Sequence, residues 1–491
     1  MMRRWEGLCL VLLLATGCAG SRALCPIEGG RPWSEVRSKH FRIQTNMTPE
    51  AATKTALELE KYRRALLLAW GRDFDPPGTV DVIVLRNATE LDEFSEGQFI
   101  GFATTVEGRP LLVMGGNGYL LEDSPDLRLQ AHELTHHLSS YTLLRQPRWV
   151  SEGLAEYLET VHIRVSTNEA VLGRANAGRF GYVREHGWLD LEELWKWDEG
   201  VVEGAAETQR HYASAWLWVH YLINMHPKRF SDFQRRLALA QEPRRAWEAA
   251  FQGVEDLKGG LRDYVIIGRY AIATHPLPPV PTQVEVRPLE PADAHAVRAM
   301  LYLHSPNGWS AERRDSEARR EVTQGMKEGP TNVSATLLSM RLGGKASRKL
   351  EAARALVAAH PEDGRAWNLL AGLLPEKSQE REEAHVRATA LLPDDARILE
   401  HRAWHSVRRE EPEKGLEAAR RAAALLPGDA TVLDTYALLL FQVGRCPEAM
   451  GVQRRAMDML HERAPAKMRR VLSQRLQSYE AECGATAPVK P

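Results

Sequence analysis

The sequence predicts an α+β domain followed by an all-α domain of helical repeats. Before residue 116, short apolar stretches alternate with helical stretches, which is typical of a small mixed sheet with helices. The proline-rich residues 275–281 cannot form a continuous helix and indicate a stiff, extended linker. Beyond them, Pro330, Pro361, Pro393 and Pro427 recur at intervals of roughly 34 residues, which predicts stacked helix pairs.

The first domain is predicted from three strands and a series of helices. Residues 40–45 alternate polar and apolar side chains, and residues 80–85 and 111–114 are compact apolar runs, as strands are. Thr48 and Pro49 are suited to begin a helix with an apolar face. From residue 126 to about residue 270 the pattern is helical, and its many tryptophans are interpreted as core side chains.

Length and composition narrow the class of protein. A chain of 491 residues favours two or three domains. Hydrophobic residues make up 44% and charged residues 26%, the balance of a globular protein with buried cores. The formal net charge of -1 gives no overall attraction to nucleic acid, so no nucleic-acid partner is expected.

The N-terminal residues predict export. Arg3 and Arg4 precede a short apolar run at residues 8–15, which is far shorter than the roughly 20 residues of a membrane-spanning helix. Residues 15–18 resemble the lipobox of bacterial lipoproteins, which implies a signal peptide over residues 1–18 and lipidation of Cys18. We therefore expect a protein of the bacterial cell envelope, held to a membrane only through a lipid anchor. An ordinary cleaved signal would instead give a secreted protein.

Cysteine usage fits an oxidising compartment without fixing a disulfide. Once Cys9 and Cys18 are set aside, Cys25, Cys446 and Cys483 remain, and an odd number cannot all pair within one chain. Cys446 and Cys483 lie about one helical repeat apart, so a bridge between them is one open possibility. No CxxC spacing suggests a cysteine zinc site.

Side chains after two of the recurring prolines resemble the tetratricopeptide (TPR) code. Small and aromatic residues stand where paired helices must touch, including Trp367 and Ala371 in one repeat and Tyr436 and Ala437 in another. The middle repeat departs from the code, with Arg402 where a large apolar residue is usual. A TPR-like array implies a concave surface for a protein or peptide partner. A generic bundle of Ala- and Leu-rich helices is the alternative.

The chemistry is concentrated in residues 132–136, which read His-Glu-Leu-Thr-His. A spacing of four on a helix places His132 and His136 one turn apart on the same face, where they can hold Zn²⁺. Glu133 lies beside them without occupying a coordination position, so it is the candidate general base that takes a proton from the attacking water. His137 points away from His136 by about 100° and is interpreted as structural.

A catalytic zinc site usually has a third protein ligand. Residues 149–157 form a second helical segment after a turn at Gln146 and Pro147, and its Glu152 is the natural third ligand. Glu156 as the ligand, with Glu152 in support, is the alternative.

These residues resemble the gluzincin metallopeptidases, in particular the peptidase MA-like families, in which HExxH is followed by a W-x-x-E-G-x-A-E-Y type segment. The resemblance covers roughly residues 38–240. It implies a zincin-like domain, with Glu152 completing the zinc site and Glu156 orienting a zinc-bound histidine. Only 15 residues separate His136 from Glu152, fewer than in thermolysin or aminopeptidase N, and no G-x-M-E-N segment is present. The substrates of those enzymes therefore do not carry over.

The same resemblance implies an oxyanion donor, and the proline pattern completes the domain plan. Residues 210–216 are similar to the family's Y-x-x-S helix, so Tyr212 is the expected donor, with His211 in reserve. Residues 111–114 are expected to be the edge strand that binds substrate. The expected plan is a zincin-like peptidase domain at residues 33–272, a Pro-rich linker at 273–292 and helical repeats at 293–485.

The sequence therefore predicts an exported zinc metallopeptidase, an endopeptidase acting on a protein or peptide substrate, with repeats that bind substrate or a protein partner. The alternative is an envelope lipoprotein scaffold in which the zinc site is structural or idle. Hydrolysis of another acyl compound is a further possibility, because the same zinc chemistry attacks other acyl centres.

Overall fold

The computed structural model describes most of the chain: residues 22–71, 74–95, 101–106, 108–116, 125–200, 202–268, 270–306, 308–343, 349–460 and 464–485. The expected signal peptide and its lipidation residue Cys18 lie outside these ranges. Within them, no helix combines the length and the apolar character that crossing a membrane requires.

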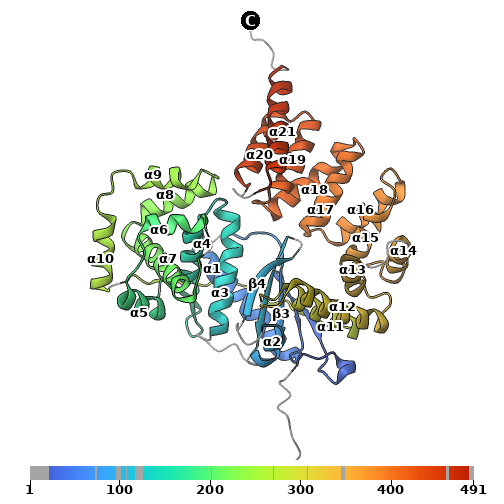
Figure 1. Ribbon diagram of the computed structural model, residues 1–491, viewed down its shortest axis with the longest axis horizontal. Helices are drawn as coiled ribbons and strands as arrows, with labels where there is room; N and C mark the ends of the chain where they lie inside the picture. Colours follow the sequence, from blue (N-terminus) through green and yellow to red (C-terminus); the bar gives the residue numbers. More distant parts are fainter. Residues whose placement is uncertain are drawn as a thin grey trace, which may run out of the picture.

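A six-stranded mixed sheet lies at the centre of the molecule (Figure 1). Its order is β4-β5-β3-β2-β1-β9. Strands β2, β3 and β5 are parallel to one another, and the other three strand pairs of this sheet are antiparallel: β4 with β5, β1 with β2, and β9 with β1. The strands are β1 (Ser34–Arg37), β2 (Phe41–Thr45), β3 (Val80–Leu85), β4 (Gly101–Val106), β5 (Arg109–Gly115) and β9 (Glu285–Pro288).

Alternate side chains of the central strands point to opposite faces of the sheet, and each face borders a separate hydrophobic core. Val82 and Met114 point into the larger core, which is covered by α1 (Pro49–Leu67) and α3 (Pro125–Thr142). Ile83 follows Val82 and Val113 precedes Met114, and both point into a second core on the opposite face of the sheet. This period of two is what a strand buried on both faces produces. The sheet is thus held between α3, which carries the HExxH motif, and a separate layer of helices.

That second layer is α11 (Pro291–His304) packed against α12 (Ala311–Glu328), with α2 (Ala88–Ser95) beside it. The predicted boundary at residues 273–292 is therefore wrong. The stretch is extended, as its prolines require, but it is not a linker, because β8 (Ala273–Pro276) pairs with β7 and β9 pairs with β1. The first two helices assigned to the repeat domain cover the back of the sheet.

The helices around the HExxH motif form the rest of the first unit. A small antiparallel sheet, β6-β7-β8, lies beside them. Its other strands are β6 (His162–Arg164) and β7 (Glu169–Leu172), and the helices are α4 (Arg148–Leu158), α5 (Ala177–His186), α6 (Leu191–Trp195), α7 (Ala205–Met225), α8 (Pro227–Ala238), α9 (Pro243–Phe251) and α10 (Leu257–Ile267). The tryptophans of this region pack in the core, as predicted: Trp149, Trp195, Trp197, Trp216 and Trp218 are buried, and Trp188 and Trp247 are partly buried against the same core.

Beyond α12 the chain is an array of helix pairs, which confirms the prediction of TPR-like repeats. The paired helices α15, α17 and α19 each begin after an aspartate N-cap, at Asp363, Asp395 and Asp429, and each packs on the next helix. The array comprises α13 (Val333–Arg341), α14 (Lys349–Ala359), α15 (Gly364–Leu373), α16 (Gln379–Leu391), α17 (Ala396–Arg408), α18 (Pro412–Leu425), α19 (Ala430–Gln442), α20 (Cys446–Asp458) and α21 (Ala466–Ala485). Cys446 and Cys483, whose pairing the sequence left open, form a disulfide between α20 and α21.

The repeats run from α13, beside α11 and α12, to α19–α21, which lie above the sheet in the view of Figure 1. The hydroxyl of Tyr141, at the end of α3, donates a hydrogen bond of 3.1 Å to the carbonyl of Leu425 in α18. Arg109 of β5 forms an ion pair of 3.3 Å with Asp395. These contacts bring the loops before α17 and α19 close to the HExxH helix.

Candidate functional site

His132, His136 and Glu152 converge, as the sequence predicts. Ala131, Leu134 and Leu138 are fully buried and fix one face of α3 against the core, which leaves the face with the two histidines turned toward α4. Glu152 lies on α4, which packs directly against α3.

The three side chains have the spacing of a metal site. The Nε2 atoms of His132 and His136 are 3.2 Å apart, and Glu152 Oε2 lies 3.5 Å from the first and 3.2 Å from the second. Ligand atoms around a tetrahedral ion with bonds of about 2.0–2.1 Å are separated by about 3.3 Å. Among the described residues, no further hydrogen-bond partner reaches the buried Glu152 Oε2. The group therefore fits Zn²⁺ with room for one more ligand.

The charges of this group are strongly coupled. Burial lowers the pKa of His132, but its hydrogen bonds with Glu152 and Glu159 outweigh burial and raise the pKa to about 10. Burial likewise raises the pKa of Glu152, but the two histidines lower it to about 2. In the chain alone, Glu152 is thus ionised and faces a protonated imidazole, and a divalent cation would replace that proton.

The outer ring nitrogens are each held by one residue of α4 or its end. His136 Nδ1 lies 2.9 Å from Ser151 Oγ, and His132 Nδ1 lies 3.2 Å from Glu159 Oε2. The prediction that Glu156 orients a zinc-bound histidine is therefore wrong. The carboxylate that does so is Glu159, because it stands at the C-terminal end of α4, where its side chain reaches across to α3.

Glu156 instead supports this carboxylate from behind. Its two carboxylate oxygens accept from Arg179 Nη2 at 2.6 Å and Nε at 2.7 Å. Asn176 Nδ2 donates to Glu159 Oε1 at 2.7 Å and reaches Glu156 Oε2 at 3.4 Å. Arg179 and Asn176 thus hold the two glutamates beside the histidines.

We expect Glu159→Gln to weaken zinc binding by about 10–100-fold, the usual cost of losing a carboxylate that orients a metal-bound histidine. The amide keeps the size of the side chain but removes the charge that faces His132 Nδ1. Zinc affinity is measured by competition with a chelating dye, with Glu185→Gln, an exposed change on α5, as the control. Equal affinities in the two variants would show that Glu159 does not support the site.

Gly153 explains how α4 can lie so close to α7. A Cβ atom at this position would stand 2.5 Å from the carbonyl oxygen of Ala215 and 2.5 Å from a methyl group of Val219. The helices can approach only because residue 153 has no side chain. The Glu-Gly pair of the sequence therefore has two uses: Glu152 faces the histidines, and Gly153 admits α7.

We expect Gly153→Ala to destabilise the protein by about 1–3 kcal/mol through overpacking, although alanine favours a helix. The matched control is Gly181→Ala on α5, where an added Cβ meets nothing within 4 Å. That change is expected to stabilise the protein by about 0.4–1 kcal/mol. Urea unfolding of both variants measures the difference, and similar midpoints would contradict the packing argument.

Tyr212 of α7 lies close enough to Glu152 and Arg148 of α4 for their charges to act on its phenol. Its ring packs edge-on against Trp197 at 5.3 Å, and the guanidinium of Arg179 lies 5.6 Å from the ring. Burial and the charge of Glu152 raise the pKa of Tyr212, while Arg148 lowers it. The phenol is therefore protonated at neutral pH and can donate a hydrogen bond. His211, the reserve candidate, instead packs on Trp197 and bonds the Glu207 carbonyl with its Nδ1.

A cavity of about 940 Å³ opens beside the metal-binding group. Glu133 and His136 line it from α3, Thr104 and Thr105 line it from β4, and residues of the repeat loops close its far side. His137 also borders it but packs on Tyr141, as expected of a structural residue. Glu133 is thus the carboxylate of the HExxH motif that faces open space.

Strands β4 and β5 both line this cavity, but the edge strand is not the one that the sequence suggested. Residues 111–114 lie in β5, which is paired on both sides, with β3 and with β4. The edge strand is β4, which runs antiparallel to β5 and whose outer side is unpaired in the described sheet. The prediction of 111–114 as the substrate-binding edge is therefore wrong, because β4 separates it from the edge.

Several site residues escaped the sequence analysis. Glu159 follows Glu152 and Glu156 at spacings of seven and three, so the helical period alone marks all three as one face. Arg148, at the start of α4, stacks on Trp197 at 4.5 Å and reaches Glu152 at 4.0 Å, and the same period relates it to Glu152. Arg179 gave no such signal, since it comes from a separate helix.

Known proteins resemble parts of this chain. Residues 130–243 match a family described only as a protein of unknown function (DUF1570). No curated protein matches the sequence. Solved structures that resemble the chain include the MamA protein (17% identity, covering 39% of this chain and 98% of that chain, TM-score 0.26). Another is a thermophilic TPR protein of Thermus thermophilus (19% identity, covering 39% of this chain and 99% of that chain, TM-score 0.27). A third is yeast Tom70 (12% identity, covering 58% of this chain and 63% of that chain, TM-score 0.31). TM-scores this low do not establish a shared fold, so the repeats are assigned from the chain's own helix pairs.

Proposed function

We propose that the chain is a zinc-dependent metallopeptidase that cleaves extended peptide segments. The observation that carries the proposal is the convergence of His132, His136 and Glu152 at mutual distances of 3.2–3.5 Å, with Glu133 beside them facing a cavity. A purely structural site would have no use for a carboxylate that stands next to the ligands without joining them.

The residues of the chain divide the work of hydrolysis. When bound, zinc supplies a Lewis acid that polarises the scissile carbonyl and lowers the pKa of water. Glu133 accepts the proton of the attacking water and passes it to the leaving amine. Tyr212 donates a hydrogen bond to the oxyanion that develops on the carbonyl. Glu159 and Ser151 keep both imidazoles in the orientation that binds the ion.

The unpaired side of β4 supports an extended substrate. Its backbone groups can pair with a peptide strand laid along it, as in other strand-addition complexes. Thr104 and Thr105 of β4 line the same cavity as Glu133, so a peptide paired there passes beside the general base. In folded proteins most strands are already paired on both sides, so the proposed substrate is a loop, a tail or an unfolded segment.

The helical repeats contribute a surface for protein binding next to the cleft. Arrays of this kind generally bind protein or peptide partners, and here the loops before α17 and α19 form one wall of the cavity. We propose that they bind the part of a protein substrate, or of an accessory protein, that lies outside the cleft. The Cys446–Cys483 disulfide supports export to an oxidising compartment, with a lipid on Cys18 as the membrane anchor.

The test uses the chain without residues 1–18 and an unfolded casein-type substrate. Cleavage is expected to stop when a chelator removes zinc and to return when zinc is restored. His136→Ala is expected to lose both zinc and activity, whereas His186→Ala, an exposed change on α5, keeps both. Cleavage that persists in the metal-free protein would exclude the proposed mechanism.

The second candidate is a scaffold that binds proteins through its repeats, with an idle zinc site. It is favoured by the docking of α18 on Tyr141 and of Asp395 on Arg109, which narrows access to the cavity. The same assay separates the two functions. A scaffold would bind zinc and a partner yet leave every peptide substrate intact.

A further inference from the structure

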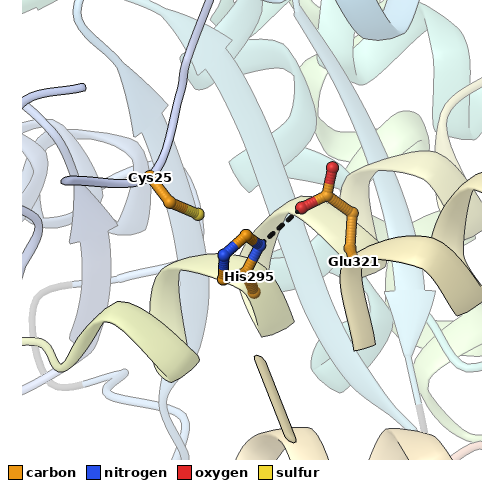
Figure 2. A group of neighbouring side chains, drawn as sticks. All are labelled: Cys25, His295 and Glu321. Atoms are coloured by element: carbon orange, nitrogen blue, oxygen red, sulfur yellow. Dashed lines mark hydrogen bonds and ion pairs between the residues drawn. The ribbon is translucent and has the colours of Figure 1, made fainter. Parts of the chain in front are cut away.

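A second group of metal-binding side chains lies behind the sheet, far in sequence from the HExxH motif. Cys25 comes from the N-terminal segment just before η1 (Pro26–Glu28), His295 from α11 and Glu321 from α12. Their potential ligand atoms all lie within 4.8 Å of one another. Figure 2 shows the thiol and the carboxylate directed at the imidazole ring from opposite sides. The three residues are 0%, 1% and 4% exposed, so the group is sealed from solvent.

The imidazole of His295 lies between two carboxylates. Its Nδ1 is 2.7 Å from Glu321 Oε2, and its Nε2 is 3.3 Å from Glu328 Oε1. The other oxygen of Glu328 is buried without a hydrogen-bond partner in the described part of the chain. The second oxygen of Glu321 accepts from Arg298, which also binds Glu93. Arg320 Nη2 also lies 3.5 Å from this oxygen, so Arg298, Arg320 and the imidazole share the negative charge of Glu321.

The thiol of Cys25 has no other evident use. Cys446 and Cys483 are already paired, which leaves Cys25 as the free cysteine of the described chain. The thiol is fully buried, so no solute reaches it from solvent. A thiol sealed in this way cannot meet a substrate, so a Cys-His-Glu catalytic triad is excluded. A ligand role is what remains for a reduced cysteine kept beside a histidine and a glutamate.

We propose that Cys25, His295 and Glu321 bind a zinc ion that fastens the N-terminal segment to the α11–α12 pair. Thiolate, imidazole and carboxylate together are a typical zinc ligand set and supply three of the four positions that zinc takes. This site is separate from the proposed catalytic centre and does not depend on it.

The exchange of protons for zinc is balanced. One proton lies between His295 Nδ1 and Glu321 Oε2, which are 2.7 Å apart. Zinc binding releases that proton and the thiol proton, so an ion of charge +2 replaces two protons and the net charge of the pocket is unchanged. The three potential ligand atoms, which lie within 4.8 Å of one another, draw together around the ion.

The site would join three segments that are distant in the chain. Arg298 of α11 already joins the N-terminal segment to this helix layer, because its Nη1 donates a hydrogen bond of 2.6 Å to the carbonyl of Ala23. Zinc at Cys25 adds a bond between the same N-terminal segment and both helices of the back layer. It thereby holds in place the part of the chain that follows the proposed lipidated cysteine.

Cobalt tests this site without relying on activity. The purified chain lacking residues 1–18, with its disulfide intact, is made metal-free and titrated with Co²⁺. Only this site offers a thiolate, so a thiolate-to-cobalt charge-transfer band in the near ultraviolet is expected, saturating at one ion per chain and disappearing when zinc is added. The His132–His136–Glu152 group contains no sulfur, and His136→Ala should leave the band unchanged.

Variants then identify the ligands. Cys25→Ser and His295→Gln are expected to lose the band and one equivalent of bound zinc, while His304→Gln, on the same helix, keeps both. The parent chain decides the matter even where a variant fails to fold. If the parent shows no band although one thiol per unfolded chain is titratable, the site does not exist. A band that persists in His295→Gln would equally overturn it.

Discussion

Replacing Glu133 by glutamine is expected to lower kcat/KM for peptide cleavage by about 10²–10⁴-fold, the usual contribution of a general base. Glutamine has the size of glutamate but cannot accept the proton of the attacking water. Because Glu133 lines the cavity beside His136 without belonging to the ligand group, zinc content should stay at the level of the parent. The assay is peptide cleavage under single-turnover conditions, with bound zinc measured on the same samples.

Two comparisons make this result specific. Glu185→Gln removes an exposed carboxylate on α5 and should leave both activity and zinc unchanged. Glu152→Gln removes a ligand and should lose zinc and activity together. Cleavage by Glu133→Gln at the parent's rate would assign the base elsewhere. Loss of zinc from Glu133→Gln would show instead that this carboxylate holds the ion.

The metal-binding group was predictable because it depends on local periodicity. His132 and His136 share a face through the spacing of four, and Glu152 was found from the need for a third ligand on the next helix. Glu156 was assigned the wrong partner because sequence spacing does not tell which of two carboxylates on one face reaches a given histidine. The choice depends on two residues of another part of the chain: Arg179 binds the carboxylate of Glu156, and Asn176 donates a hydrogen bond to the carboxylate of Glu159.

Pairing between strands that are distant in the sequence could not be predicted from local sequence patterns. The prolines of residues 273–292 correctly indicated extended chain, but the hydrogen bonds of β9 are made with β1, about 250 residues away in sequence. Nothing local distinguishes an extended linker from an edge strand. For the same reason the sequence marked β5 as apolar and overlooked β4, whose Thr104 and Thr105 lie at the edge that faces the cavity.

The contact between the repeats and the cavity could not be predicted from the sequence either. Periodicity predicted the helix pairs, yet the curvature of the array depends on contacts that no repeat code contains. Gly108, with a φ of +80°, allows Arg397 to approach, since a Cβ there would lie 2.9 Å from the Arg397 Nε atom. The tight turn between β4 and β5 and the loop before α17 therefore fit together at a residue that only glycine suits.

Tyr212→Phe is expected to lower kcat by about 10²–10³-fold, the usual loss when one oxyanion donor is removed. The phenol is placed for this role by α7, which Gly153 admits against α4, and the charge of Glu152 acts on its hydroxyl. Phenylalanine keeps the edge-on contact with Trp197 and loses only the donor.

The expected split is a fall in kcat with little change in KM or in bound zinc, because the hydrogen bond forms as negative charge develops on the carbonyl and not in the bound substrate. Tyr182→Phe is the matched control, since its hydroxyl bonds only the Ala206 carbonyl among the described residues, away from the ligands. A loss confined to KM would make Tyr212 a substrate-binding residue. Full activity in Tyr212→Phe would transfer the role to His211 or Arg148, and His211→Gln and Arg148→Ala would then show which of the two donates.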